Sequence, residues 1–268
     1  MMEIRFGNLT AELRDPIDIS VPMDFNGPQP NAYGVGPARS EPCVSGELIG
    51  DTRRGGSCNF ERYTIVPHCN RTHTECVGHI TKKRISVREC LRDSIVPAAL
   101  ISVEPLAAGA TEDSYSIALA EADRVIARAP LEQVISKIDA KAAALIVRTL
   151  PNDESKLVRR YGDEIPPFFT SEAMALIVEK GFDHLVVDLP SVDRMFDEGK
   201  LSNHRLFWNV EPGKFKVSSE TRMRSTITEL AFVPEDVLDG LYFLNLQIAP
   251  FVADASPSRP LLYRAGMS

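Results

Sequence analysis

The stretch CNRTHTECVGH, residues 69–79, gathers two histidines, one carboxylate and two thiols in a short segment of the chain. The whole chain has only five histidines, and a third one, His68, immediately precedes the stretch. Imidazole, thiolate and carboxylate are the side chains that bind zinc, manganese or iron. No repeated C-x-x-C pair accompanies them, so the spacing does not indicate a zinc finger. The stretch therefore predicts a metal site, and one of a catalytic kind.

The spacing within the stretch allows three side chains to reach one ion. If the stretch is helical, Cys69 and His73 share one face, because they are four residues apart. If it is extended, His73 and Glu75 lie on the same side, because they are two residues apart. Either geometry would let the three side chains converge. Three protein ligands with an open position are typical of a hydrolytic metal site. Each residue alone could be merely structural, but their concentration in one window favours a metal site.

The composition indicates a globular protein and argues against several other classes. Of the 268 residues, 44% are hydrophobic and 25% are charged, and the formal net charge is -7. This charge, without a basic cluster that contains aromatic residues, argues against nucleic-acid binding. No stretch approaches the roughly 18 apolar residues of a membrane span, and residues 1–15 have no apolar signal core. Five cysteines do not suggest a disulfide framework, so we expect a cytoplasmic protein without a membrane partner.

Apolar runs along the chain predict a mixed α/β fold. A Thr170 N-cap and a stop at Gly181 predict one helix, and a shorter helical segment is expected at 131–137. Gly, Pro, Asn and Ser in residues 28–42 predict a long irregular surface loop. We expect one domain over residues 1–268, with sheet packed on sheet and a few covering helices. Strands are expected at 3–6, 16–22, 62–67, 95–103, 142–149, 185–188, 225–230 and 241–250.

Several other polar residues are interpreted as structural. Asp188 and Asp193 follow a strand and are predicted to be turn and cap residues. His184 follows a helix stop, which predicts a surface position. Cys76 would point away from the site on an alternating strand, so core packing is its expected role. His68 could replace Cys69 as a ligand, although it lies one position earlier in the chain.

The stretch 69–79 carries C-x-R-T-H-x-E-x-V-x-H, which resembles the motif H-x-G-T-H-x-D-x-P-x-H. That motif belongs to the metal-dependent cyclase family, which includes bacterial kynurenine formamidase and isatin hydrolase. Thr72, His73 and His79 match the motif directly, and Glu75 is a longer carboxylate in the aspartate position. The remaining motif positions differ: Cys69 replaces the first histidine, Arg71 the glycine and Val77 the proline.

Further segments resemble the family in the expected order along the chain. Asp18-Ile19-Ser20 is similar to its N-terminal D-[IL]-S strand, and residues 187–193 are similar to its V-D-x-x-S-[VI]-D turn. His204 fits the family's second-metal histidine, and Glu229 fits the glutamate of its E-N-L segment. The tail, residues 240–260, resembles the closing segment of the family. The resemblance implies a mixed-sheet β/β/α swivelling-type single domain that forms a homodimer or homotetramer.

The resemblance also implies a site of one or two ions, either Zn2+ or, alternatively, Mn2+. Cys69, His73 and Glu75 would hold the first ion. Glu75 would bridge to a second ion held by His204 and Glu229. A thiolate in place of an imidazole at position 69 favours zinc over manganese.

The implied activity is hydrolysis of an amide-type bond in a small, often aromatic substrate, such as a formamide or a lactam, as in an arylformamidase. His79 would act as general base and then as general acid, while the ion polarises the carbonyl. Arg71 would either bind an anionic group of the substrate or, as a guanidinium near the ions, repel the metal. Two alternatives stay open: a non-catalytic relative, suggested by the changes at Arg71 and Val77, or an enzyme of the same fold that catalyses cyclisation or dehydration.

Overall fold

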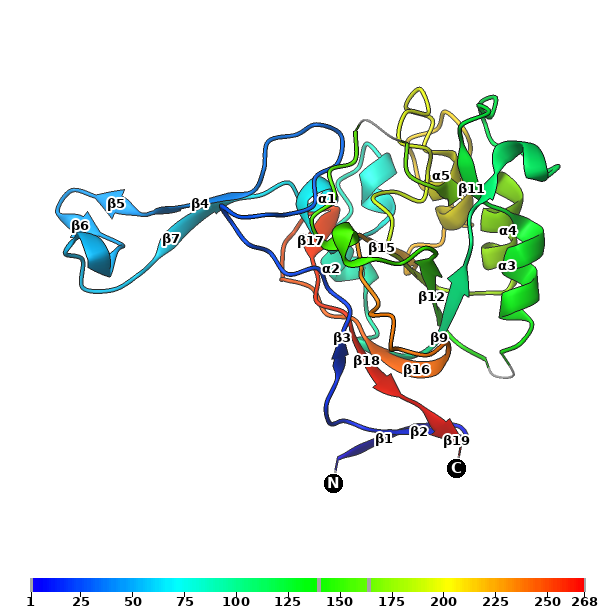
Figure 1. Cartoon of the computed structure of the whole chain (residues 1–268), viewed down its shortest axis with the longest axis horizontal. Helices are drawn as coiled ribbons and strands as arrows, with labels where there is room; N and C mark the ends of the chain where they lie inside the picture. The colour runs from blue at the N-terminus through cyan, green and yellow to red at the C-terminus, as the bar shows by residue number, and fades with distance from the viewer. Residues whose placement is uncertain (1, 139–140, 163–164, 268) are drawn as a thin grey trace.

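The computed structural model describes residues 2–138, 141–162 and 165–267, and its centre is one long mixed β-sheet (Figure 1). Four neighbouring strands at the middle of this sheet run parallel, and the strands on either side of them run antiparallel. In sheet order, the strands are β17 (Ala255–Pro257), β8 (His73–Glu75), β15 (Thr226–Glu229), β14 (His184–Val187), β12 (Ala144–Thr149), β9 (Ile95–Val103), β16 (Gly240–Asn245), β18 (Leu261–Arg264) and β3 (Ile17–Asp18).

The parallel strands are apolar along their whole length because both faces of the sheet are covered. Side chains that alternate along β9 enter two different cores: Ala99 and Ile101 belong to one, and Ala98 and Leu100 belong to the other. The same alternation holds along β12 and β14. The predicted mixed α/β fold is therefore confirmed, and the expected strand at 95–103 has the same bounds in the structure.

Three helices cover one face of the sheet. Helices α3 (Arg128–Ile135) and α4 (Ser171–Glu179) lie side by side, and α5 (Ser202–Trp208) packs against α4 (Figure 1). The cap chemistry predicted for α4 is confirmed, because the Thr170 side chain accepts a hydrogen bond from the Ala173 N–H. Among the described residues, no helix is both long enough and apolar enough to cross a membrane.

Residues 39–64 form an arm that projects from the body (Figure 1). The two strands nearer the body, β4 (Arg39–Pro42) and β7 (Glu61–Thr64), pair with each other. The tip consists of β5 (Val44–Ser45), β6 (Leu48–Ile49) and η1 (Thr52–Arg54). The strand expected at 62–67 is thus part of the arm and does not lead directly into the ligand-rich stretch. Helix α1 (Pro67–Asn70) intervenes, since a proline is well suited to the first turn of a helix.

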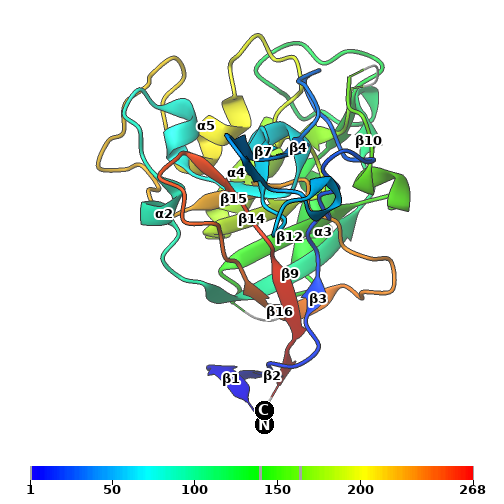
Figure 2. The same cartoon turned by 90° about the vertical axis from the view of Figure 1, so that its left-hand side faces the viewer.

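The two ends of the described chain meet in a small sheet below the body (Figure 2). Strand β2 (Leu9–Glu12) lies at its centre and pairs with β1 (Glu3–Phe6) on one side and with β19 (Gly266–Met267) on the other. Another small sheet joins β10 (Leu106–Ala107), β11 (Arg124–Ile126) and β13 (Phe168–Phe169). The remaining short helices are η2 (Val77–Ile80), α2 (Val87–Cys90), η3 (Ala108–Ala110) and η4 (Glu154–Leu157).

Two segments predicted to lie at the surface are buried wholly or in part, because tertiary packing covers them. His184 is buried in β14, with its Nδ1 2.9 Å from the Thr226 hydroxyl of the neighbouring strand. The Gly- and Pro-rich residues 28–42 do not form a surface loop throughout. Gln29, Asn31 and Ala32 are buried, and Gln29 is hydrogen-bonded to both backbone groups of Ala38.

Asp188, predicted as a turn residue, instead forms a buried ion pair. Its carboxylate lies 2.8 Å from Lys156 Nζ, and it also accepts hydrogen bonds from the Thr149 N–H and hydroxyl. Lys156 Nζ donates in addition to the Thr149 carbonyl and to Asn152 Oδ1. Both charged groups are therefore compensated inside the protein.

We expect the substitution Lys156→Met to lower the free energy of unfolding by about 3–5 kcal/mol, because it leaves the Asp188 carboxylate buried without its cation. Urea denaturation followed by circular dichroism measures the change. The control is Lys180→Met at an exposed position after α4, which should change stability by less than about 0.5 kcal/mol. A similar effect of both substitutions would contradict this account of the pair.

Candidate metal centre

The site begins at the paired strands β8 and β15. The register places His73 directly opposite Glu229, and His73 Nε2 lies 3.5 Å from Glu229 Oε2. The alternation along β8 puts Glu75 on the same face as His73, as predicted, and all three side chains are buried. Their ligand atoms lie within 4.8 Å of one another, which makes these residues a first triad that could hold a metal ion.

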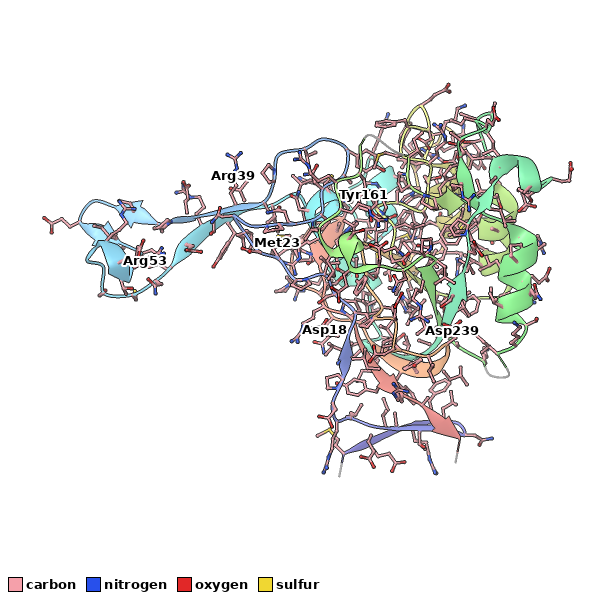
Figure 3. The ribbon with its side chains drawn as sticks, in the orientation of Figure 1. Asp18, Met23, Arg39, Arg53, Tyr161 and Asp239 are labelled. Carbon is pink, nitrogen blue, oxygen red and sulfur yellow. The ribbon has the colours of Figure 1, made fainter. Side chains whose placement is uncertain are left out.

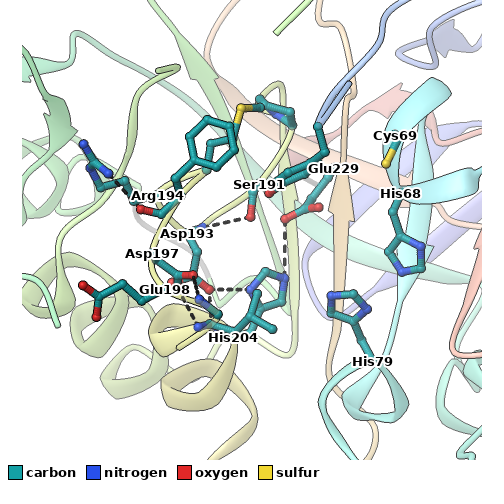
Figure 4. A pocket seen from close by; sticks show the side chains of 16 residues that line it. His68, Cys69, His79, Ser191, Asp193, Arg194, Asp197, Glu198, His204 and Glu229 are labelled. Carbon is teal, nitrogen blue, oxygen red and sulfur yellow. Dashed lines mark hydrogen bonds and ion pairs between the residues drawn. The ribbon is translucent and has the colours of Figure 1, made fainter. Parts of the chain in front are cut away.

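Two short helices add two further imidazoles beside Glu75. His68 of α1 has Nε2 3.3 Å from Glu75 Oε2, and His79 of η2 has Nδ1 3.6 Å from the same oxygen. The two rings are stacked, with their centroids 4.5 Å apart (Figure 4). His68, Glu75 and His79 form the second triad that could hold an ion.

Asp254, just before β17, contacts both of these histidines. Its Oδ2 lies 3.3 Å from His68 Nε2 and 3.3 Å from His79 Nδ1. The chain tail reaches this position because β17 pairs with β8, with Ala255 opposite Glu75. No motif in the sequence pointed to Asp254, which was only part of the tail segment, residues 240–260.

His204 enters the site from α5 and is held there by Asp193. His204 Nδ1 lies 2.5 Å from Asp193 Oδ2, while Nε2 lies 2.8 Å from Glu75 Oε1 and 3.6 Å from Glu229 Oε1 (Figure 4). Asp193 also accepts hydrogen bonds from the backbone N–H groups of Asn203 and His204, so its carboxylate serves the start of α5 although it does not precede that helix directly in the sequence. A carboxylate behind a histidine fixes the ring orientation, as at many metal sites.

The charges of the site are strongly coupled. Burial alone would raise the pKa of Glu75, but the positive charges of His79 and His204 and a hydrogen bond from His204 hold it well below its usual value. Burial opposes protonation of His68, yet Asp254 and Glu75 raise its pKa to about 10. The pKa of His204 is likewise raised against the effect of its burial, chiefly by the charge of Glu75. The carboxylates thus attract positive charge into a buried space.

Several atoms in this space have no hydrogen-bond partner. Among the described residues, six buried side-chain N or O atoms lack one, and three of these are His68 Nε2, His73 Nε2 and Glu75 Oε2. Buried polar atoms are normally hydrogen-bonded, so such a group needs an explanation. Imidazole nitrogens and a carboxylate oxygen that face one another without hydrogen bonds fit a metal cation, because each can donate a lone pair.

The structure does not bring Cys69 Sγ into either triad. Cys69 is buried beside Ala32, Tyr161 and Leu230, and it lines the cavity above the site. Burial, aided by the charge of Glu229, raises the pKa of its thiol to about 11, which opposes formation of the thiolate. Helix α1 turns the chain between the arm and β8. Because of this turn, it is His68, one residue before Cys69, that contacts Glu75.

Arg71, unlike Cys69, does not line the cavity above the site. Its side chain lines a separate cavity with Asp18 and Phe232 among its other residues. Only its backbone carbonyl serves the site, accepting a hydrogen bond from His73 Nδ1 over 3.0 Å. The structure therefore brings together five of the seven residues singled out from the sequence: His73, Glu75, His79, His204 and Glu229.

A cavity of about 760 Å³ opens above these groups and is large enough for a small organic molecule. Its polar floor includes His68, His79, His204 and Glu229 (Figure 4). Its opposite wall is largely apolar and carries Tyr33, Met195, Phe196 and Leu201.

Comparisons with known proteins identify a family and similar folds. A family model described as "Putative cyclase" matches residues 17–194, about two thirds of the chain. No match was found among curated protein sequences.

Similar solved structures share the fold at low sequence identity. Isatin hydrolase A from Labrenzia aggregata is 16% identical with a TM-score of 0.62, covering 96% of this chain and 94% of that one. Isatin hydrolase A from Ralstonia solanacearum is 15% identical with a TM-score of 0.59, covering 96% and 92%. A protein described as a potential metal-dependent hydrolase with cyclase activity is 17% identical with a TM-score of 0.60, covering 93% and 97%.

We expect the substitution His68→Ala to weaken Zn2+ binding by about 100-fold or more, because it removes an imidazole that contacts Glu75. Cys69→Ala should change the affinity by less than about threefold, since Sγ lies in neither triad. Competition with a chromophoric zinc chelator measures both affinities. A greater loss in Cys69→Ala than in His68→Ala would restore the assignment made from the sequence motif.

Proposed function

Because the chain belongs to the Cyclase family, we propose that it is a metal-dependent hydrolase whose site is the cluster around Glu75. One observation carries the proposal: three buried ligand atoms, on His68, His73 and Glu75, have no hydrogen-bond partner at a site beneath a cavity large enough for a substrate. His73, Glu75, Glu229 and His204 would hold one ion, and His68 would help to hold it or a second ion beside Glu75. With His68 in place of Cys69, the donors are imidazole and carboxylate, which suit Zn2+ and Mn2+ alike.

The substrate that we propose is an amide-type compound with a small aromatic body, such as a formamide or lactam. When bound, the ion would act as a Lewis acid toward the substrate carbonyl and make nearby water more acidic. Water oxygen bonds to the carbonyl carbon, the C–N bond breaks, and the nitrogen leaves with a proton. The apolar wall formed by Tyr33, Met195 and Phe196 suits the aromatic body, and isatin hydrolases have the same fold.

His79 is placed to move the proton. It lines the cavity, so one face of its ring is accessible to water and substrate, while Nδ1 contacts Asp254 and Glu75. We assign His79 the role of general base toward water and then of general acid toward the leaving nitrogen. Asp254 orients the ring through its contact with Nδ1.

The proposed assembly is a homodimer or homotetramer in the cytoplasm. The arm supports it, because its exposed Val44, Leu48 and Tyr63 are apolar side chains on a projecting segment that a second copy could cover.

For the purified protein, we expect one or two equivalents of Zn2+ or Mn2+ per chain by elemental analysis. A panel of N-formylarylamines, lactams and isatin should contain a compound that is hydrolysed, and dialysis against a chelator should abolish turnover until metal is restored. A protein that retains no transition metal, with turnover insensitive to chelation, would rule out the proposed function.

The substitution His79→Ala should lower kcat by about 100-fold to 10,000-fold, the usual contribution of a general base. Metal content should stay close to that of the original protein, because the other groups still hold the ion. Stopped-flow rates and elemental analysis give the two readouts. Loss of the metal together with activity would instead make His79 a ligand.

Asp254→Asn should lower kcat by about 10-fold to 100-fold with little change in KM, because the amide keeps the contact with His79 but loses the charge. Asp254→Glu should restore part of the loss. Steady-state kinetics measure both constants. An unchanged kcat in Asp254→Asn would show that Asp254 serves only the fold.

A further inference from the structure

A second cavity, of about 500 Å³, lies beside Arg71. It shares no lining residue with the cavity above the metal centre. Figure 3 labels two of its residues, Asp18 and Met23. The full lining is Asp18, Ser20, Val21, Pro22, Met23, Arg71, Leu157, Phe232 and Arg259.

Arg71 is the unusual residue of this cavity. Its Nε is buried without a hydrogen-bond partner, and its guanidinium forms no ion pair with any of the described residues. Six other arginines of the chain are buried or half-buried in the structure, and each donates to at least one protein oxygen. They are Arg128, Arg148, Arg159, Arg194, Arg205 and Arg222.

The Arg71 side chain is half-buried, and its Nε has lost water without gaining an acceptor, which costs free energy. Burial lowers the pKa of Arg71, and no neighbouring carboxylate opposes this effect. The guanidinium nevertheless stays charged at neutral pH, since its pKa in water is above 12. An anion in the cavity would provide the missing acceptor.

The carboxylate already in the cavity cannot serve this purpose. Asp18 accepts hydrogen bonds from the Ser20 N–H and hydroxyl and lies 2.7 Å from Arg259 Nε. The hydrogen-bond and ion-pair partners of the Asp18 carboxylate therefore lie on the same side of the cavity as Asp18. The other walls are apolar and consist of Val21, Pro22, Met23, Leu157 and Phe232.

We propose that this cavity binds a small organic anion, with its carboxylate on Arg71 and its apolar body against Met23 and Phe232. The guanidinium supplies up to five N–H donors in a planar fork that matches a carboxylate. The volume fits a ligand the size of a substituted benzoate. The site is separate from the proposed catalytic cavity and adds a second ligand to the function proposed above.

The position of the site links it to the metal centre. Arg71 and His73 are two residues apart, and the Arg71 carbonyl accepts a hydrogen bond from His73. Val21, which lines the anion cavity, donates its N–H to the Thr72 hydroxyl between them. An anion on Arg71 therefore lies next to the backbone that orients His73.

Methyl NMR of protein labelled with 13C-methyl methionine tests the proposal with benzoate as the probe. Met23 reports on the anion cavity, and Met195 reports on the cavity above the metal centre. Met23→Leu and Met195→Leu assign the two signals. We expect benzoate to shift the Met23 signal until it saturates, and this titration gives the Kd for benzoate. The substitution Arg71→Gln should raise this Kd by about tenfold or more.

Three controls make the result specific. Arg224→Gln removes the same charge from an exposed position and should leave the Kd within twofold, or about 0.4 kcal/mol. Benzamide has the shape of benzoate without its charge and should bind about tenfold or more weakly. Arg71→Lys keeps a cation and should bind benzoate more tightly than Arg71→Gln does, while unchanged thermal melting shows that each variant is folded.

The proposal is overturned if benzoate shifts only Met195, or if the Met23 shift is the same in Arg71→Gln. Inorganic phosphate that binds as tightly as benzoate would overturn the assigned apolar body of the ligand. A Met23 response in protein that shows no metal binding would support this site even if the proposed hydrolase function failed.

Discussion

The buried carboxylate of Glu75 is the constraint on which the centre of this structure depends. A charged carboxylate inside a protein is stable only if cations or hydrogen-bond donors surround it. Here His68, His79 and His204 approach it from three different short helices, and one of its oxygens has no hydrogen-bond partner. The same arrangement that compensates Glu75 leaves lone pairs directed at a common space, which is the requirement for binding a cation.

The sheet brings these segments together. Strand β8 lies between β15, which carries Glu229, and β17, which follows Asp254, so three distant parts of the chain become neighbours. Helix α5 then places His204 against both glutamates, and Asp193 fixes the helix start and the imidazole at once. The rigidity of the site thus comes from backbone pairing, and its charge balance comes from side chains that the loops add.

Side chains of one short segment, residues 68–79, point to two different places. Strand alternation directs His73 and Glu75 to the metal centre, whereas Arg71 extends into a cavity that shares no residue with the one above the centre. A positive guanidinium in the family's glycine position therefore need not repel a metal ion. It is instead the unpaired charge of a second cavity, where an anion would offset the cost of its burial.

The sequence by itself determined the mixed α/β fold, the main strands and the grouping of His73 with Glu75, because these follow from local periodicity and a short motif. It also singled out His79, His204 and Glu229 through a family resemblance, although their roles in binding metal stay predictions. Tertiary structure alone decided that His68 contacts Glu75 while Cys69 packs among apolar side chains, and that Asp254 joins the site. The reason is that the turn of α1 and the pairing of β17 with β8 set the direction of these side chains, and neither leaves a periodic signal in the sequence.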